Sequence, residues 1–429
     1  MAMAMKVEII HKETIKPSSP TPPDLKTLKL SLLDQFTPAT YTPIILFYPA
    51  GAERSQNLKT SLSETLTLWY PLAGRLKDNA YIKCEDQGAK YVEARIKCPL
   101  SDILNKPDVE VLKQFLPASI ESPEAATGNF LLVQATFFDC GGLAIGVCIS
   151  HKMADAATLN TFVRSWAATA NSSSELVRPV FMGASIFPPI DLSIPMTPVE
   201  LMQRKCITKR FVFSASKLAA LRAKVASTSV PKPSRVEAVS GLIWKGVMTA
   251  VRSNFGCFRP SVWSISVNLR KRLVPALPEN YSGNCVGFIG PKNIEDNELE
   301  LQELVGRIRK EMEEFGENYV KKIQEDGALL AICDFSKEFG ELAKSNHTDF
   351  YVCSSWCKFD IYGADFGWGR PIWVSSTSTE VRNVAILMDT RDGDGIEAWL
   401  TLSEEDMALL ESNQELLEFA ALNPSVPLS

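Results

Sequence analysis

The residue of this sequence best suited to acid–base chemistry is His151. Only three histidines occur in the 429 residues, and this one opens the run His-Lys-Met-Ala-Asp, which ends at Asp155. An unperturbed imidazole has a pKa of about 6.5, so at neutral pH it is mostly free base and can accept the proton of an alcohol. A histidine at a strand end can also serve structure alone, so the spacing does not decide between a general base and a structural residue.

A second segment of chemical interest is a glycine-rich run formed by Asp365, Phe366, Gly367, Trp368 and Gly369. Its first three letters match the D-F-G motif of protein kinases. Neither a Gly-rich phosphate loop, nor a V-A-I-K lysine, nor an H-R-D loop accompanies it, so we exclude the kinase interpretation. We expect a tight structural loop in which Trp368 anchors the packing.

Composition narrows the class of protein. The formal net charge of -5 and the pI near 5.6 argue against a broad basic surface for nucleic acid. No apolar run reaches the roughly 20 residues that cross a bilayer, and the segment from Met1 to Lys16 lacks the features of a signal peptide. We therefore expect a cytoplasmic enzyme without nucleic-acid or membrane partners.

The cysteines and histidines give no pattern of a metal site. The 10 cysteines are scattered without a C-x-x-C pair, and with 3 histidines a site of several imidazoles is nearly excluded. Reduced thiols in the core of a cytoplasmic protein are the expected state. The sequence predicts neither a bound metal nor a disulfide framework.

The elements around His151 place it where mixed α/β proteins carry their chemistry. The segment Leu143 to Ile149 is apolar on both faces, which is typical of a central strand covered on each side. A helix is expected from about Ala156, with one apolar face formed by Leu159, Phe162, Val163, Trp166 and Ala170. The run from His151 to Asp155 thus occupies a strand-to-helix turn.

A proline-rich stretch from about Pro179 to Thr197 shows no sustained periodicity and is the predicted crossover between two lobes. We expect an N-terminal lobe over residues 1–185, a linker over 186–205 and a C-terminal lobe over 206–429. In the second lobe, Ser234-x-x-Glu237 predicts a helix that opens with a capping box. The runs 384–388 and 396–402 flank a turn of aspartates and glycines and are expected to pair as a hairpin.

Together, the two segments resemble the signature motifs of the BAHD acyltransferases, H-x-x-x-D and D-F-G-W-G, and their separation of roughly 210 residues also fits that family. Further stretches similar to the family are Tyr70 to Arg75, Asn268 to Arg270, Gly283-Asn284 and Ser354 to Trp356. The resemblance therefore covers nearly the whole chain. It implies an α/β, two-lobed fold like that of chloramphenicol acetyltransferase, with mixed sheets, flanking helices and a channel between the lobes.

The same resemblance implies the chemistry. Acyl-CoA is a co-substrate in a ternary complex, no cofactor is bound permanently, and His151 deprotonates the hydroxyl of the acceptor. Trp356 is the candidate donor to the oxyanion of the intermediate through its indole N–H, and Ser354 is a weaker candidate. Asp155 is expected to point away from the channel and to pair with Arg270, which holds the turn in place.

The phosphates of coenzyme A need positive partners. A helix N-terminus offers free N–H groups and the favourable end of a dipole, so the helix that opens at Ser234 makes Lys232, Ser234 and Arg235 candidate contacts. An ordinary helix cap explains Ser234 equally well.

Within the family, the segments PSSPTP, ILFYP, SSWCKFDIYGADFGWGRP and LMDTRDGDGIEAW are most similar to the vinorine synthase-like branch of alcohol acetyltransferases. This implies a monomer that moves an acetyl group from acetyl-CoA to a hydroxyl of a plant specialised metabolite, such as an alkaloid, a terpenoid or another small alcohol. The run from Tyr281 to Cys285 differs by one residue from the Y-F-G-N-C of anthocyanin-type malonyltransferases, which leaves a malonyl donor open. An N-acyltransferase that forms amides and a non-catalytic binding relative are the further alternatives.

Overall fold

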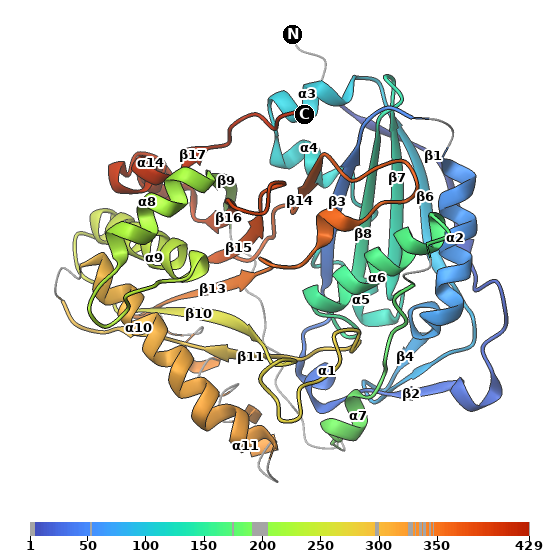
Figure 1. Ribbon diagram of the computed structural model, residues 1–429, viewed down its shortest axis with the longest axis horizontal. Coiled ribbons are helices and arrows are strands. Elements are labelled where there is room, and N and C mark those ends of the chain that lie inside the picture. Colours follow the sequence, from blue (N-terminus) through green and yellow to red (C-terminus); the bar gives the residue numbers. More distant parts are fainter. Residues whose placement is uncertain are drawn as a thin grey trace.

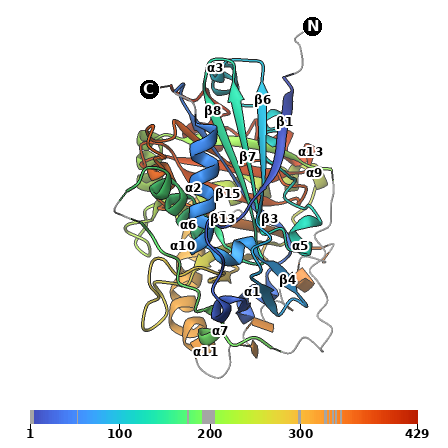
Figure 2. The ribbon, with the colours of Figure 1, turned by 90° about the vertical axis from the view of Figure 1, so that its right-hand side faces the viewer.

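Two large mixed sheets dominate the computed structural model, and helices pack against both of them (Figure 1). The structure describes residues 5–51, 54–173, 176–190, 205–296, 300–324 and 347–428, and the short pieces 329–330, 332–333, 337, 340–342 and 345. Seen from the side, the first sheet stands in front of the second (Figure 2).

The first sheet has six strands in the order β1-β6-β7-β8-β3-β14. Their bounds are β1 (Val7–Ile15), β3 (Tyr41–Tyr48), β6 (Ala89–Ile96), β7 (Leu131–Phe138), β8 (Leu143–Ser150) and β14 (Trp373–Ser375). Every residue of β3 and β8 is buried, because each strand lies between two neighbours and is almost wholly apolar on both faces. At Gly146 in β8 a Cβ atom would lie 2.0 Å from the carbonyl oxygen of Phe115, so only glycine fits there. The central strand predicted over 143–149 is confirmed as β8.

Two helices pack side by side next to this sheet (Figure 1), α2 (Ser55–Leu68) and α6 (Ala156–Ala170). The start predicted for the second of them and most of its predicted apolar stripe are confirmed. Reciprocal hydrogen bonds join the pair, since Trp69 Nε1 donates to Ser165 Oγ and Trp166 Nε1 donates to Ser61 Oγ, each at 3.0 Å. This packing holds α6 against α2, and the turn that carries the histidine leads directly into α6.

The second sheet runs in the order β11-β10-β13-β15-β16-β9-β17, with β12 paired to β10. Its strands are β9 (Ile207–Phe213), β10 (Ser261–Asn268), β11 (Val286–Ile289), β12 (Lys292–Asn293), β13 (Asp349–Ser355), β15 (Val384–Asp389), β16 (Ile396–Leu402) and β17 (Ala421–Leu422). The helices of this lobe are α8 (Ala215–Val225), α9 (Arg235–Phe255), α10 (Leu301–Glu314), η3 (Phe315–Tyr319), α11 (Val320–Gln324), α13 (Glu404–Leu410) and α14 (Gln414–Phe419). The predicted capping box opens α9, and β15 and β16 pair as the predicted hairpin.

A small three-stranded sheet lies below the first sheet in Figure 1. Its strands are β2 (Thr27–Lys29), β5 (Tyr81–Lys83) and β4 (Arg75–Lys77). The short helices are η1 (Pro23–Leu25), α1 (Leu32–Phe36), η2 (Tyr70–Ala73), α3 (Leu100–Asn105), α4 (Val109–Lys113), α5 (Glu124–Thr127), α7 (Gly183–Ile186) and η4 (Ile361–Gly363). Among them α1 bears most on the site, because its first turn contacts the second lobe.

The chain passes between the lobes more than once. β14 pairs antiparallel with β3, although it belongs by sequence to the expected C-terminal lobe, and Val426 donates its N–H to the carbonyl of Leu104 at 2.8 Å. Trp373 of β14 stacks on Trp399 of β16 with ring centroids 6.2 Å apart. Of the expected linker 186–205, residues 191–204 lie outside the described residues. The division into 1–185, 186–205 and 206–429 therefore stays a prediction.

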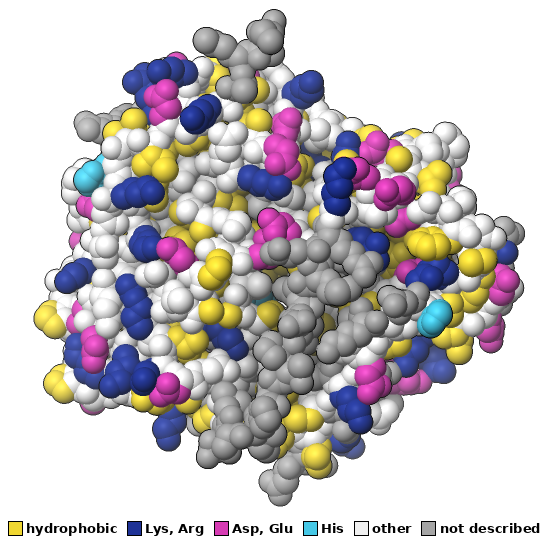
Figure 3. All heavy atoms as spheres, turned by 180° about the vertical axis from the view of Figure 1, so that it is seen from behind, with side chains coloured by type: hydrophobic (Ala, Val, Ile, Leu, Met, Phe, Trp, Pro, Cys, Tyr) yellow, Lys and Arg dark blue, Asp and Glu magenta, His cyan; other side chains and the backbone are white. Residues whose placement is uncertain are grey.

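The surface carries charges of both signs. Basic and acidic side chains are interspersed over the face shown in Figure 3. All ten cysteines, each among the described residues, are free thiols. None of the described helices combines the length and the apolar character needed to cross a bilayer.

Candidate active site

His151 lies directly after β8, where the two lobes meet. Its backbone N–H donates to the carbonyl of Thr40 at 2.8 Å, which extends the pairing of β8 with β3 by one residue. Its Nδ1 lies 3.0 Å from Oδ1 of Asn284, a residue of the loop between β10 and β11 in the second lobe. The predicted base is thus held by one element from each lobe.

Asn284 determines which nitrogen of His151 carries the proton. The Nδ2 of Asn284 donates at 2.8 Å to Oδ1 of Asp34 and at 2.7 Å to the backbone carbonyl of His151. Both amide hydrogens are therefore used, so the group that faces the imidazole is the amide oxygen, which can only accept. Nδ1 is then the protonated nitrogen of His151, and Nε2 carries the lone pair.

The protonation state of the ring follows from its surroundings. Burial lowers the pKa of His151 below the ordinary value, because the imidazolium form is poorly solvated there. The charge of Asp155 and the hydrogen bond to Asn284 act in the opposite direction without outweighing burial. At neutral pH the ring is neutral, and the lone pair on Nε2 can take a proton.

Asp155 is committed to contacts that hold the turn. Its Oδ1 accepts the N–H of Thr158 at 2.9 Å and so caps α6. The guanidinium of Arg270 donates to both carboxylate oxygens, to Oδ2 at 2.7 Å and to Oδ1 at 2.9 Å, and Oδ2 also accepts the N–H of Cys285 at 3.0 Å. Burial raises the pKa of Asp155, but Arg270 and the backbone donors lower it more, so the carboxylate is ionised.

Arg270 ties this turn to the second lobe. Besides Asp155, its guanidinium donates to Oγ1 of Thr158 at 3.0 Å and to the carbonyl of Gly283 at 2.9 Å, and it lies 5.1 Å from the ring centroid of Tyr281. Arg270 is 4% exposed and Asp155 is 2% exposed. A pair buried so completely stabilises the junction only while both charges are present, because removing one leaves the other without a partner.

The two candidate oxyanion donors stand at the end of β13. Trp356 is 5% exposed, and its indole Nε1 donates to Oγ of Ser354 at 3.1 Å. Within the described residues, no hydrogen bond links either side chain to His151. The indole N–H has to leave Ser354 before it can serve an oxyanion, so this role stays a prediction.

The loop from Asp365 to Gly369 is anchored in the core of the first lobe by Phe366. Phe366 is fully buried and meets Tyr48 and Trp166 edge to face, with ring centroids at 5.9 and 4.9 Å. Trp368 stacks on Phe366 at 5.5 Å. These contacts are those of a packing anchor.

The backbone of the loop depends on its glycines. Oδ1 of Asp365 accepts the N–H of Gly367 at 2.8 Å and that of Gly369 at 2.9 Å. Both glycines have φ of 96°, in the left-handed region that other residues rarely adopt. The carboxylate therefore closes a turn that only glycine at these two positions forms without strain.

The three candidate contacts for coenzyme A lie at the start of α9. Oγ of Ser234 accepts the N–H of Glu237 at 3.2 Å, and Oε2 of Glu237 accepts the N–H of Ser234 at 2.6 Å, which completes the capping box. Lys232 is exposed. Arg235 pairs with Asp389 at 2.8 Å and borders a surface hollow whose opposite side is formed by α8. A cap thus accounts for Ser234, Arg235 is paired with Asp389, and Lys232 is open to solvent.

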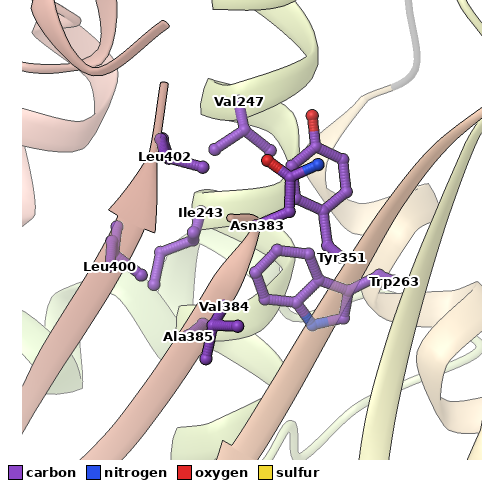
Figure 4. A pocket seen from close by; sticks show the side chains of 9 residues that line it. All are labelled: Ile243, Val247, Trp263, Tyr351, Asn383, Val384, Ala385, Leu400 and Leu402. Atoms are coloured by element: carbon purple, nitrogen blue, oxygen red, sulfur yellow. The ribbon is translucent and has the colours of Figure 1, made fainter. Parts of the chain in front are cut away.

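The second lobe also contains a small cavity of about 10 Å³ (Figure 4). Trp263, Tyr351 and Asn383 line one side of it, and aliphatic side chains of α9 and β16 line the other. Among the described residues, Nε1 of Trp263 finds no hydrogen-bond partner. A space of this size holds at most about one water, so it belongs to the core and is too small for a substrate.

Known proteins similar to this chain identify its family. The model of the Transferase family matches residues 5–417. This chain is a BAHD acyltransferase. Akuammiline synthase 1 of Alstonia scholaris is 41% identical to it over 428 residues, which are 98% of this chain and 99% of that protein. Stemmadenine O-acetyltransferase of Catharanthus roseus is 40% identical over 425 residues, which are 96% and 97% of the two chains.

Solved structures agree with this assignment. The crystal structure of vinorine synthase, a protein of Rauvolfia serpentina, matches this BAHD acyltransferase with a TM-score of 0.87 at 37% identity, over 98% of this chain and 100% of that one. The predicted α/β fold with mixed sheets and flanking helices is confirmed. As a member of the family, the protein is an acyl-CoA-dependent acyltransferase.

Two residues of this BAHD site were not assigned from the sequence. Asn284 stood out only as part of a family-like stretch, and Asp34 gave no signal beyond Ser-x-x-Asp, the spacing of a helix cap. Their sequence separation explains this, because Asp34 and Asn284 are 250 residues apart and His151 and Asn284 are 133 apart. No local pattern encodes contacts between residues so far apart in the sequence.

Proposed function

We propose that this enzyme transfers an acetyl group from acetyl-CoA to a hydroxyl of a plant specialised metabolite such as an alkaloid or a terpenoid, with His151 as the general base. The observation that carries the proposal is the commitment of Nδ1 to Asn284, since it leaves Nε2 as a free base in a neutral ring. The relative named stemmadenine O-acetyltransferase supports an acetyl donor and a hydroxyl acceptor.

The reaction needs one base and no covalent intermediate on the protein. Nε2 of His151 takes the proton of the acceptor hydroxyl, and the resulting alkoxide oxygen bonds to the thioester carbonyl carbon within a ternary complex. The tetrahedral intermediate then loses its C–S bond, and the thiolate of coenzyme A takes the proton from the imidazolium. The products are the ester and free coenzyme A, and the histidine is neutral again.

Trp356 stabilises the oxyanion of that intermediate in this proposal. Its indole N–H turns from Oγ of Ser354 to the developing charge, and Ser354 is a second, weaker donor. One such donor is worth about 10²–10³ in rate. Asp155 and Arg270 contact neither substrate and act by holding the turn that carries His151.

Coenzyme A binds at the start of α9 in this proposal. Lys232 is exposed there, Ser234 opens the helix, and Arg235 borders the hollow, so phosphate groups would meet two cations and a helix N-terminus. The N-terminal lobe, residues 1–185, supplies the base, and the C-terminal lobe, residues 206–429, supplies these contacts. We place the enzyme in the cytoplasm, in keeping with ten free thiols, and we expect a monomer.

The experiment that tests the proposal is thiol release from acetyl-, malonyl- and coumaroyl-CoA, each against a panel of alcohols and amines. The protein with His151→Ala is run beside the wild type, and thermal unfolding of both proteins shows that the variant is folded. We expect release only with acetyl-CoA and an alcohol, and a fall of about 10²–10⁴ in turnover for the variant, the usual worth of a general base.

Each other outcome has a definite meaning. A fall below tenfold in a folded His151→Ala variant removes this residue from the mechanism. A faster reaction with an amine than with every alcohol makes the enzyme an N-acyltransferase, and a preference for malonyl-CoA changes the donor. No release across the panel means that the acceptor lies outside the panel or that the protein binds ligands without catalysis.

A further inference from the structure

Asp34 makes two separate sets of contacts with its two carboxylate oxygens. It is the third residue of α1, where Oδ2 accepts the N–H of Ser31 at 2.9 Å and its hydroxyl at 2.6 Å. Oδ1 accepts from Asn284 alone, from the backbone N–H and from Nδ2, both at 2.8 Å. One oxygen therefore caps a short helix of the first lobe, and the other holds a residue of the second lobe.

Four donors favour the ionised form of Asp34. Three of them are N–H groups, from Ser31 and from Asn284, which can only donate. Burial raises the pKa of Asp34 above its ordinary value, and the hydrogen bonds from Ser31 and Asn284 lower it without outweighing burial. The ammonium of Lys152 is also close, since its Nζ donates to the carbonyl of Gln35 at 2.9 Å and interacts favourably with the charge of Asp34.

We propose that Asp34 is a positioning residue for the acyl transfer: through the amide of Asn284, its carboxylate orients His151 and strengthens Nε2 as a base. This inference rests on the proposed function, in which Nε2 takes the proton of the acceptor hydroxyl. Asp34 itself contacts neither the imidazole nor a reacting atom.

Two hydrogen bonds in series, from Asn284 to Asp34 and from His151 to Asn284, carry the polarising effect of the Asp34 charge to the imidazole. A negatively charged acceptor at Nδ2–H polarises the amide and makes its oxygen a stronger acceptor for Nδ1–H of His151. A stronger acceptor at Nδ1 favours the imidazolium that forms when Nε2 takes a proton. The carboxylate of Asp34 is thus joined to the ring by hydrogen bonds, although the two residues belong to different elements.

The other ionisable groups around His151 are not linked to its ring by hydrogen bonds among the described residues. The charge of Asp155 also favours the imidazolium, but Arg270 and two backbone N–H groups occupy the carboxylate oxygens of Asp155. Burial raises the pKa of the Tyr281 hydroxyl and of the Cys285 thiol, so both are neutral at pH 7. Lys152 lies on the histidine turn itself, and burial lowers its pKa to about 8, which leaves it mostly charged at pH 7.

Asp34→Asn removes the negative charge of Asp34 while it can keep the two hydrogen bonds from Asn284. Placed with its amide oxygen toward Asn284, the new side chain still accepts both hydrogen bonds that Oδ1 accepts now, and only the negative charge is lost on that side. On the other side, its amide can donate to the hydroxyl of Ser31 but leaves the N–H of Ser31 without an acceptor. The variant therefore weakens the helix cap as well as removing the charge.

The chain offers a matched control for the cap. Asp406 is the third residue of α13, where its Oδ2 accepts the hydroxyl of Ser403 at 2.7 Å and its Oδ1 accepts Nδ2 of Asn254 at 3.1 Å. It thus shares with Asp34 a serine hydroxyl on one oxygen and an asparagine amide on the other, without the backbone N–H that Ser31 donates to Asp34. No hydrogen bond among the described residues joins Asn254 to a histidine, so Asp406→Asn removes a carboxylate from the start of a helix without a link to the imidazole.

The experiment measures His151 directly, by NMR titration of the ring nitrogens in full-length protein labelled at histidine. Only His11, His151 and His347 contribute signals, and the signal absent from His151→Ala identifies His151. We expect wild-type protein at high pH to show the Nδ1–H tautomer. Asp34→Asn should lower the pKa of His151 by about half a unit to one unit, less than a direct charge contact gives, and Asp406→Asn should leave it unchanged.

Kinetics give a second, independent measurement. With Asp34→Asn we expect kcat to fall about fivefold to tenfold with little change in KM for acyl-CoA, and the acid limb of kcat/KM to move to lower pH. In the background of Asn284→Ala the same change should have almost no further effect on the pKa of His151, because the link is already cut. An unchanged pKa of His151 in folded Asp34→Asn, or an equal shift with and without Asn284, overturns the inference.

Failure of this inference differs from failure of the proposed function. If His151→Ala retains thiol release, the general base is wrong, whatever the titration shows. If His151→Ala is inactive but Asp34→Asn titrates like the wild type, the general base stands and Asp34 is only a helix cap.

Discussion

Around the turn from His151 to Asp155, charged and polar groups from both lobes converge, whereas the loop from Asp365 to Gly369 is surrounded by aromatic rings of the first lobe. At the turn, Asn284 and Arg270 reach across from the second lobe. At the loop, the buried ring of Phe366 packs between Tyr48 and Trp166 in the core of the first lobe.

Two motifs that identify the same family can therefore be held together by different interactions. The turn depends on charge, because each carboxylate there balances a buried cation or orders an amide. The loop depends on shape, because its one carboxylate serves its own backbone. Substitutions that remove charge without volume should therefore damage the turn, and substitutions that remove volume should damage the loop.

Asp155→Asn should give the largest combined effect. It leaves the buried guanidinium of Arg270 without its charge partner, which we expect to cost about 3–5 kcal/mol of unfolding free energy. Activity per folded molecule should fall as well, because the turn that carries His151 loses its tie to the second lobe. Thermal unfolding and thiol release on the same preparation measure both effects.

Glu397→Gln is the matched control for this prediction. It removes the partner of Arg210, which is 2.7 Å away and equally buried, but in the second sheet. We expect a similar loss of stability with activity per folded molecule retained. Unchanged thermal stability in Asp155→Asn would count against the importance of its pairing with Arg270.

Phe366→Ala should reduce stability by about 3–5 kcal/mol, the usual cost of emptying a buried aromatic site, with little effect on kcat of the folded fraction. Phe115→Ala provides the comparison, since Phe115 is also fully buried in the first lobe and packs against Phe47 at 5.5 Å. If Phe366→Ala abolishes turnover while Phe115→Ala at equal stability does not, the loop takes part in the chemistry and the contrast drawn above is wrong.

The smallest expected effect is in the dependence on pH. The unfolded chain takes up the proton of His151 at higher pH than the folded enzyme, because burial lowers the pKa of this residue in the folded state. The group therefore contributes stability above pH ~6.5 that is lost as pH falls through the folded pKa.

For the same reason, kcat/KM should rise with pH and level off with a midpoint below about 6.5. His11→Gln, which changes an exposed histidine, should leave the midpoint of this profile unchanged. A midpoint above that of a free imidazole would contradict the effect of burial.

Local patterns in the sequence were sufficient to predict the strand and the helices that flank the site. The apolar run over 143–149 and the helical stripe from Ala156 are β8 and α6, and the capping box at Ser234 begins α9. In each case the pattern repeats within one element, so neighbouring residues carry the information.

The contacts that make the site could not be predicted in the same way. Asp34, His151 and Asn284 meet only because three separate turns are brought together by the assembly of both sheets. The three-residue strand β14 is too short to show a period, and its pairing with β3 depends on the loop before it. The pairing of Asp155 with Arg270 was expected from family resemblance alone, since the residues are 115 positions apart.

The position of β14 has a consequence for how the chain is made on the ribosome. The hydroxyl of Tyr48 at the end of β3 meets the carbonyl of Ala364, 316 residues later, and β14 follows shortly after it. During synthesis, therefore, the apolar edge of β3 stays uncovered until most of the polypeptide has emerged. Such an edge is open to pairing with other chains, so the nascent first lobe needs protection such as a chaperone gives, and a fragment that stops before β14 would tend to aggregate.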